Sequence, residues 1–374
     1  MRKKRKLNNY FSLAYYYASD YLLVVSLFKT ICYILCFVFL SPFCAFANEI
    51  ELSAQSAIAI DAYTKTVLYE KNANAERAIA STTKIMTCLL ACESNRLDEG
   101  VVINQNMLNG CEGSMIYLSS GDRITLYDLV CGAMIASGND AANAIAFFLA
   151  GSAKSFAKMM NDRALTLGMN STKFVTPSGL DKGGNHSTAY DMALLSAFAL
   201  QNKTLMGIAS MKSAQISINN KKQTIYNHNK LLSYSEDFIG LKTGYTKKAG
   251  RCLVSAYKYG GSIIICVTLN ADDDWQDHKT LVNYTKKCYK DIYKGEKLKI
   301  SVVGGEKDSV ECFGSYNAKA VSNVEYKRYY YPFVYAPIKV GDVLGKEELY
   351  INNVLIESTQ LKAEEDINQW QITK

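Results

Sequence analysis

The pattern of hydrophobic and polar positions divides the 374 residues into stretches of helical period and stretches of strand period. Between residues 81 and 94, apolar side chains at Ile85, Met86, Leu89 and Leu90 recur at helical spacing and predict an amphipathic helix. Short β-branched runs bounded by turn residues predict strands. The predicted helices are 81–94, 127–136, 141–149, 155–167, 188–200 and 280–293, and the predicted strands are 56–61, 66–70, 214–218, 252–259 and 262–270. Strands at both ends with helices between them indicate an α+β domain whose sheet pairs distant segments.

The pattern changes beyond residue 295 to short alternating runs, such as Leu298–Val303 and Val340–Leu344, separated by Gly, Asp and Asn. Alternation of this kind is typical of half-exposed strands. We therefore predict a main domain over 48–294, a small β-rich C-terminal domain over 295–363 and a tail over 364–374.

The first 47 residues have the composition of an export signal. A basic start precedes an apolar run from Ile31 to Leu40, and the small-x-small pattern Ala45-Phe46-Ala47 follows. This order predicts a cleaved signal peptide over 1–47 and a mature protein outside the cytoplasm. The stretch Tyr21–Leu40 is also long enough to stay uncleaved as a membrane anchor, so cleavage remains one of two alternatives.

The formal charge of +7 comes mainly from this signal. Residues 1–47 hold six of the 42 basic residues and one of the 35 acidic residues, so the remainder carries +2. A nearly neutral mature chain lacks the basic surface that nucleic-acid binding requires, and we expect no nucleic-acid partner. The three histidines, His186, His228 and His278, form no metal-ligand pair, so we expect no metal site and no cofactor.

Eight cysteines follow the signal segment, an even number that permits disulfides in an exported chain. None of them forms a Cys-x-x-Cys pair, and Cys88 and Cys266 lie within apolar runs. Small buried thiols explain this placement better than disulfides do, and we favour them.

Three short motifs occur in order along the chain: Ser81-Thr-Thr-Lys84, Ser137-Gly-Asn139 and Lys242-Thr-Gly244. Each motif alone has limited specificity, because partial copies occur elsewhere. These copies are Ser155–Lys158, Ser255–Lys258 and Ser217–Asn219. Only the set headed by Ser81 contains all three motifs in order, and this combination is a strong signal.

The first motif has the residue types that nucleophilic catalysis requires. A serine hydroxyl is a weak nucleophile until a neighbouring base takes its proton. A lysine three residues later, at the start of a helix, lies on the same face as Ser81. Lys84 can act as that base only if burial and a second cation lower its pKa, and Lys242 can be the second cation.

With these motifs the chain resembles the serine penicillin-binding and β-lactamase superfamily. Within it, the similarity is greatest to low-molecular-mass D-Ala-D-Ala carboxypeptidases of the Gram-positive type, peptidase family S11, and spans residues 49–363. Supporting stretches are Thr176–Asp181 and Ala336–Gly341. The resemblance implies an antiparallel sheet with helices on both faces, a helical subdomain and a small β-rich C-terminal domain. It also implies peptidoglycan stem peptides as substrates and covalent binding of β-lactams.

The resemblance assigns a role to each motif residue. Ser81 would be the acylated nucleophile, Lys84 its general base, and Ser137 a proton relay to the leaving D-Ala amine. Asn139 would orient the substrate amide. In the third motif, Lys242 and Thr243 would bind the terminal carboxylate on an edge strand, Gly244 would leave room for the substrate backbone, and the N–H groups of Ser81 and Tyr245 would form the oxyanion hole.

Two features separate this chain from relatives within the superfamily. Many members carry an arginine downstream of Lys-Thr-Gly that holds the terminal carboxylate, but residues 271–278 contain none. A class A β-lactamase needs a deacylating glutamate between the second and third motifs, and the only one there is Glu236, just before the third motif. The alternatives to a carboxypeptidase are therefore this β-lactamase and a non-catalytic receptor or scaffold of the same fold, and the complete motif set disfavours the scaffold.

The tail after residue 363 bears on membrane association. It contains three large apolar side chains, Ile367, Trp370 and Ile372, together with several acids and one lysine. A peripheral helix needs a broader apolar face, usually with basic residues opposite. We expect a secreted or wall-associated enzyme, with peripheral membrane association as the alternative.

Overall fold

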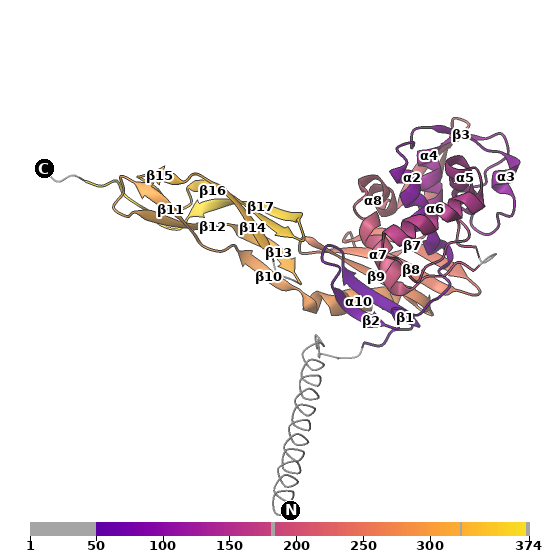
Figure 1. Ribbon diagram of the computed structural model, residues 1–374, viewed down its shortest axis with the longest axis horizontal. Coiled ribbons are helices and arrows are strands. Elements are labelled where there is room, and N and C mark those ends of the chain that lie inside the picture. The colour runs from indigo at the N-terminus through magenta and orange to yellow at the C-terminus, as the bar shows by residue number, and fades with distance from the viewer. Residues whose placement is uncertain (1–49, 181–183, 322–323, 372–374) are drawn as a thin grey trace, which may run out of the picture. The chain divides into compact units, whose positions relative to one another are not determined.

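The computed structural model describes residues 50–180, 184–321 and 324–371 (Figure 1). The predicted export signal over 1–47 lies outside the described residues. Within them, no helix has the length and apolar content that crossing a bilayer requires.

A five-stranded antiparallel sheet forms the centre of the main domain, in the order β2-β1-β9-β8-β7. Its strands are β1 (Ser56–Asp61), β2 (Val67–Lys71), β7 (Phe238–Thr246), β8 (Gly250–Tyr259) and β9 (Ser262–Ala271). The N-terminal strand β1 pairs with β9, with Ala59 opposite Cys266, so the sheet joins the two ends of the domain as expected. Strand β7 lies at the edge and carries the Lys-Thr-Gly motif.

Both faces of this sheet are buried, because successive residues of a strand project to opposite sides. In β1, Ile58 and Ile60 belong to one core, whereas Ala57 and Ala59 belong to the other. Helices α7 (Ala189–Ala199) and α8 (Lys203–Ser210) pack on the first face, and α10 (Asp274–Thr285) packs on the second. The antiparallel sheet with helices on both faces confirms the fold class predicted from the sequence.

The helical part of the domain follows β2 and covers the first face of the sheet (Figure 1). Its elements are η1 (Ala80–Thr83), α2 (Lys84–Glu93), β3 (Gly100–Val102), α3 (Gln105–Leu108), β4 (Arg123–Thr125), α4 (Leu126–Met134), α5 (Asn139–Ala150), α6 (Ala153–Thr166), the hairpin β5 (Ser213–Ile218) and β6 (Lys221–Tyr226), and α9 (Leu231–Tyr234). Side chains of Thr125, Ser152 and Thr188 cap α4, α6 and α7 by accepting a backbone N–H of the first turn.

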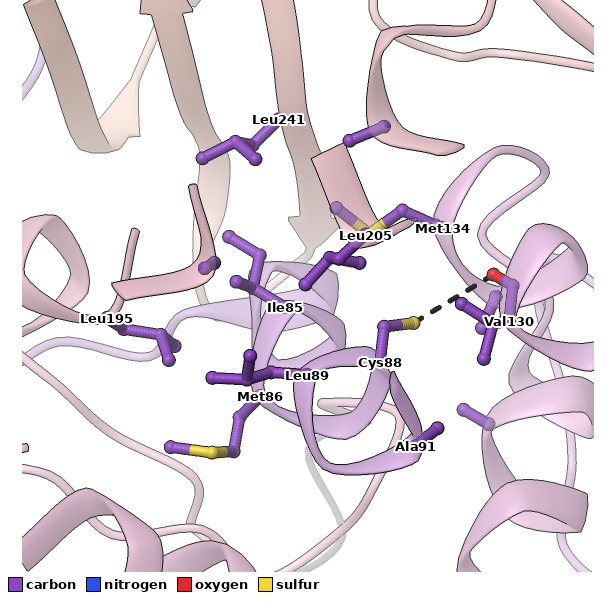
Figure 2. Packing of buried hydrophobic residues seen from close by; sticks show 14 of the residues in the cluster. Ile85, Met86, Cys88, Leu89, Ala91, Val130, Met134, Leu195, Leu205 and Leu241 are labelled. Atoms are coloured by element: carbon purple, nitrogen blue, oxygen red, sulfur yellow. Dashed lines mark hydrogen bonds between the residues drawn. The ribbon is translucent and has the colours of Figure 1, made fainter. Parts of the chain in front are cut away.

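Helix α2 lies at the centre of this core. Ile85, Met86 and Leu89 are fully buried and pack among side chains from α4, α7, α8 and β7 (Figure 2). Burial of each such side chain contributes about 1.5–3 kcal/mol. The helix that begins at Lys84 is thus held by packing on several sides, and this packing also fixes the position of the Ser81–Lys84 motif at its start.

One predicted helix of this domain has the wrong bounds, and one helix was missed. The helix predicted over 280–293 begins earlier, at Asp274, because the Asp273 side chain caps it by accepting the Gln276 N–H at 3.1 Å. It ends at Thr285, and a 3₁₀ turn, η2 (Lys286–Cys288), follows. The strand predicted over 214–218 is confirmed as β5, which pairs with β6 in a separate hairpin. Helix α8 was not predicted.

The C-terminal region is built of strands, as predicted. They are β10 (Lys290–Lys294), β11 (Leu298–Val303), β12 (Ser309–Phe313), β13 (Ser315–Ala320), β14 (Glu325–Tyr330), β15 (Phe333–Tyr335), β16 (Val343–Ile351) and β17 (Val354–Ala363). Six of them form one sheet in the order β14-β16-β17-β12-β11-β15, and β10 pairs with β13. Ile300, Val310, Leu361 and Ile367 lie in its core.

Six cysteines are buried free thiols: Cys88, Cys92, Cys131, Cys252, Cys266 and Cys312. Burial raises the pKa of the Cys92 and Cys131 thiols to about 12, so both are protonated and unreactive. For these six residues, the structure confirms the preference for thiols over disulfides.

Candidate active site

Ser81 lies in the 3₁₀ turn η1, immediately before Lys84 opens α2. The three-residue spacing brings the two side chains together, and Lys84 Nζ donates a hydrogen bond to Ser81 Oγ at 2.8 Å. Direct contact between the nucleophile and its candidate base is the arrangement that general-base activation requires.

Lys84 is fully buried, and its Nζ has two further acceptors. These are the side-chain Oδ1 of Asn139 at 2.7 Å and the main-chain O of Ser178 at 2.9 Å. Burial, and after it the positive charge of Lys242, hold the pKa of Lys84 well below its usual range. A lowered pKa gives the neutral amine, the form that can accept a proton.

The second motif lies in the turn between α4 and α5. Ser137 is buried there with a left-handed backbone (φ +60°), and Asn139 begins α5. The Asn139 amide is oriented by its Nδ2, which donates to the main-chain O of Glu112 at 2.5 Å, so that Oδ1 faces Lys84. Asp140 fixes the same loop by accepting the N–H groups of Ile116 and Leu118.

The third motif lies on the edge strand β7. Lys242 is buried and its Nζ donates to the main-chain O of Thr243 at 3.0 Å. Burial lowers the pKa of Lys242 from 10.5 to about 8. Tyr245 is mostly exposed.

Gly244 brings β7 against the turn that carries the nucleophile. A Cβ at this position would lie 3.0 Å from the Ser81 N and 3.1 Å from the Thr82 N. The sequence prediction explained this glycine by space for the substrate backbone, whereas the geometry gives a structural reason: the absence of a side chain lets β7 and η1 approach each other.

A loop following α6 contacts both η1 and α2 at the site. In addition to the Ser178 carbonyl on Lys84, the Pro177 carbonyl accepts the Thr87 hydroxyl at 2.6 Å. Gly179 has φ +82°, and a Cβ there would overlap the Ala80 carbonyl O at 1.9 Å. This loop can therefore touch both η1 and α2 only with glycine at residue 179.

The stretch Thr176–Asp181 of this loop supports the family resemblance, but no role in the site was predicted for its residues. The buried side chain that holds the loop in place is Asn185. The Asn185 Oδ1 accepts the N–H groups of Val175 and Thr176, while its Nδ2 lies 3.4 Å from Thr83 Oγ1. A buried asparagine within a Gly/Asn-rich loop is the one signal that could have marked it.

The partial motif copies lie elsewhere. Ser155 and Lys158 are on the exposed face of α6, where Lys158 pairs with Asp162. Ser255 is fully buried in β8 and lies 2.6 Å from His278 Nδ1, whereas Lys258 is exposed. Within the set headed by Ser81, hydrogen bonds join Ser81, Lys84 and Asn139.

Residues 271–278, which contain no arginine, run from the end of β9 into the start of α10 on the second face of the sheet. The Asp277 carboxylate accepts the N–H groups of Ser53 and Ala54, and His278 bridges Ser255 and Thr268. These contacts give the stretch a structural role in joining α10 to the sheet.

The comparisons with known proteins agree with this geometry. The D-alanyl-D-alanine carboxypeptidase family matches residues 44–273. The carboxypeptidase DacF of Bacillus subtilis is 37% identical over 231 residues, which cover 60% of this chain and 59% of DacF. DacC of Escherichia coli is 31% identical over 370 residues, which cover 89% of this chain and 90% of DacC.

Solved structures show the same fold. A mutant of the Streptomyces K15 DD-transpeptidase superposes with a TM-score of 0.61 at 31% identity, covering 63% of this chain and 99% of that one. Penicillin binding protein 5 from Haemophilus influenzae superposes with a TM-score of 0.61 at 25% identity and covers 86% of this chain and 100% of its own. The chain therefore belongs to the D-alanyl-D-alanine carboxypeptidase family, peptidase family S11.

Proposed function

We propose that this protein removes the terminal D-alanine from peptidoglycan pentapeptides through an acyl-enzyme on Ser81. The observation that carries the proposal is the 2.8 Å contact between Ser81 Oγ and a buried Lys84 whose pKa is lowered. β-Lactams would acylate the same oxygen and form a stable adduct.

The surroundings of Lys84 support its role as the base. Two of its three partners, the Asn139 Oδ1 and the Ser178 carbonyl O, can only accept hydrogen bonds. A neutral amine therefore directs its two N–H groups to them, which leaves its lone pair for Ser81, and in this state the Ser81 hydroxyl becomes the donor across the 2.8 Å contact. Lys84 takes the Ser81 proton as Oγ attacks the carbonyl carbon of the penultimate D-alanine.

The remaining motif residues complete the reaction. The Ser81 and Tyr245 N–H groups stabilise the oxyanion. When the tetrahedral intermediate collapses, the proton held by Lys84 passes through Ser137 to the leaving amine, and D-alanine departs. Water then attacks the ester carbonyl and returns the proton to Ser81. Lys242 and Thr243 bind the terminal carboxylate, and Asn139 binds the substrate amide.

The competing functions find less support. Glu236 is exposed and lies shortly before β7, and no hydrogen bond among the described residues joins it to Ser81 or Lys84, so it is a poor candidate for the deacylating base of a class A β-lactamase. A non-catalytic scaffold has no use for a buried lysine with a lowered pKa. Burying a lysine destabilises the fold, so a buried lysine with a lowered pKa is expected mainly where it takes part in catalysis.

We also propose that the enzyme works outside the cytoplasm after cleavage of a signal over 1–47, with domains over 48–294 and 295–363. The family acts on the cell wall, and the basic and apolar order of the N-terminus supports export. Of the apolar residues in the tail, Ile367 is fully buried in the C-terminal core, so its side chain would be withheld from a membrane.

The test is mass spectrometry of the protein after reaction with labelled penicillin. A single adduct on the peptide containing Ser81 is expected, together with release of D-alanine from a pentapeptide and loss of both in Ser81→Ala. An adduct on Ser155 or Ser255, or no adduct on any serine of a folded protein, would contradict the proposal. Ser155→Ala is the matched control and should label normally.

A further inference from the structure

Exposed aromatic side chains gather at one edge of the C-terminal sheet, where β15 pairs with β11 (Figure 1). In β15, Val334 packs against the core of this sheet, so Phe333 and Tyr335 project from the opposite, outer face. The two rings meet edge to face, with centroids 5.5 Å apart. Phe333 is nevertheless 44% exposed and Tyr335 is 69% exposed. Apolar side chains that gather on a surface, unlike isolated ones, mark a binding surface.

The C-terminal tail adds an indole to this edge. The Val303 and Gly304 carbonyls, at the end of β11, accept the N–H groups of Ala336 and Trp370. Because Ala336 directly follows Tyr335, two consecutive carbonyls hold both aromatic segments at the end of one strand. Trp370 is 75% exposed, and its indole makes no hydrogen bond or ring contact within the described residues. The indole is therefore available to a ligand.

A hollow of about 640 Å³ lies beside Trp370. Its other lining residues are Glu306, Asn368, Gln369 and Gln371. The Asn368 Nδ2 donates to Glu306 Oε1 at 3.2 Å, which orients both side chains. Amides supply donors and acceptors, and a carboxylate supplies acceptors. An aromatic face bordered by such groups suits a sugar ring, whose faces carry C–H groups and whose edges carry hydroxyl and acetamido groups.

The charges at this edge argue against an anionic ligand. None of the described residues that line the hollow is basic, and Glu306 is acidic. Two lysines that neighbour these segments in the sequence are already paired, Lys307 with Glu365 and Lys339 with Asp366. Anionic lipids and phosphate-bearing polymers are bound by unpaired basic residues. A neutral, hydroxyl-rich polymer fits this edge better.

We propose that Phe333, Tyr335 and Trp370 form a glycan-binding surface. The amino-sugar rings of peptidoglycan strands stack on these side chains, and the amides beside Trp370 bind the hydroxyl and acetamido groups. The surface holds the enzyme on its polymeric substrate while Ser81 acts on the stem peptides. It goes beyond the proposed function, because it contains none of the residues of the proposed reaction and forms or breaks no bond.

The experiment measures retention of the full chain on beads that carry glycan strands freed of their stem peptides, so that the active site has no ligand there. Trp370→Ala and Tyr335→Ala should each weaken retention by about fivefold or more. Trp370→Tyr keeps an aromatic face and should retain most of the affinity. Tyr226→Ala is the matched control, because Tyr226 is also 69% exposed but lies on β6 of the main domain, and it should bind as wild type does.

Release of D-alanine is measured in parallel on two substrates. Trp370→Ala and Tyr335→Ala should match wild type on a soluble pentapeptide but release D-alanine more slowly from intact peptidoglycan. Failure of wild type to bind the beads, or equal retention of wild type and both alanine variants, would overturn the proposal.

Two other ligands are tested with the same variants. If Trp370→Ala and Tyr335→Ala lose binding to vesicles that contain phosphatidylglycerol, or lose self-association on a sizing column, while their glycan binding is unchanged, the surface serves a membrane or a second copy and the proposal is wrong. Penicillin labelling of Ser81 is recorded as well. Its absence in wild type would overturn the proposed function and leave the result on glycan binding intact.

Discussion

Lowering the pH from 7 to 5 is expected to destabilise the main domain through His278. This imidazole is fully buried between α10 and the sheet, with Nδ1 2.6 Å from Ser255 Oγ and Nε2 3.0 Å from Thr268 Oγ1. Burial lowers its pKa from 6.5 to about 3. The unfolded chain therefore binds a proton near pH 6.5, whereas the folded chain excludes it until about pH 3.

The size of the effect follows from this difference in pKa. Within the window each pH unit removes about 1.4 kcal/mol of unfolding free energy. Between pH 7 and pH 5 only the part below 6.5 counts, which amounts to about 2 kcal/mol. For a domain of this size that corresponds to a fall in Tm of about 4 °C.

The assay is urea unfolding of the exported protein at pH 7, 6 and 5, followed by circular dichroism. His278→Gln should be less stable than wild type at pH 7, because its contacts to the two hydroxyls are altered, but its stability should change little with pH. His186→Gln, at a half-exposed histidine, is the control and should keep the slope of wild type. The window ends at pH 5 because carboxylates begin to bind protons below it. Parallel slopes for wild type and His278→Gln would refute the reasoning.

Two further predictions concern the site itself. Lys84→Met should lower the rate of penicillin acylation by about 10²–10⁴-fold, because it removes the base and leaves a side chain of similar length. The rate is read from gels of the labelled protein, and a rate near that of wild type would exclude Lys84 as the base. Gly179→Ala should reduce acylation and stability far more than Gly168→Ala. Both glycines have positive φ, but only at Gly179 would a Cβ overlap a neighbouring atom, the Ala80 carbonyl oxygen. Equal losses of the two variants in thermal melts and labelling assays would show that backbone strain alone accounts for both.

Much of the main domain could be predicted from periodicity and turn residues. Strand β1 has the predicted bounds, and α4, α5, α6 and α7 lie within two residues of their predicted starts, because long apolar patterns bounded by capping residues are the clearest local signal. Helix α10 was misplaced because its start is set by the Asp273 cap within an acidic stretch that has no apolar period. Helix α8 was missed because Gly207 and the polar start at Asn202 resemble a loop.

The active site also has residues that the sequence predicted and contacts that it could not predict. Ser81 and Lys84 meet as their three-residue spacing predicted, because this motif is local and its residue types are specific. Asn139, which its own motif singled out, joins them through a contact with Lys84 that spacing did not predict. The Ser178 carbonyl could not be found from spacing, because a main-chain oxygen has no residue type to recognise.

The Ser178 main-chain oxygen that accepts a hydrogen bond from Lys84 affects which substitutions the site can tolerate. Substitution of residue 178 alters a side chain and leaves the carbonyl in place, so this contact is protected from the replacements that remove Asn139 or Ser81. The position of this carbonyl depends instead on the path of the loop, and that path requires Gly179, which lies against the Ala80 carbonyl. Sequence drift among homologous enzymes should accordingly be permitted at residue 178 and restricted at its glycine neighbour, although only residue 178 touches the base.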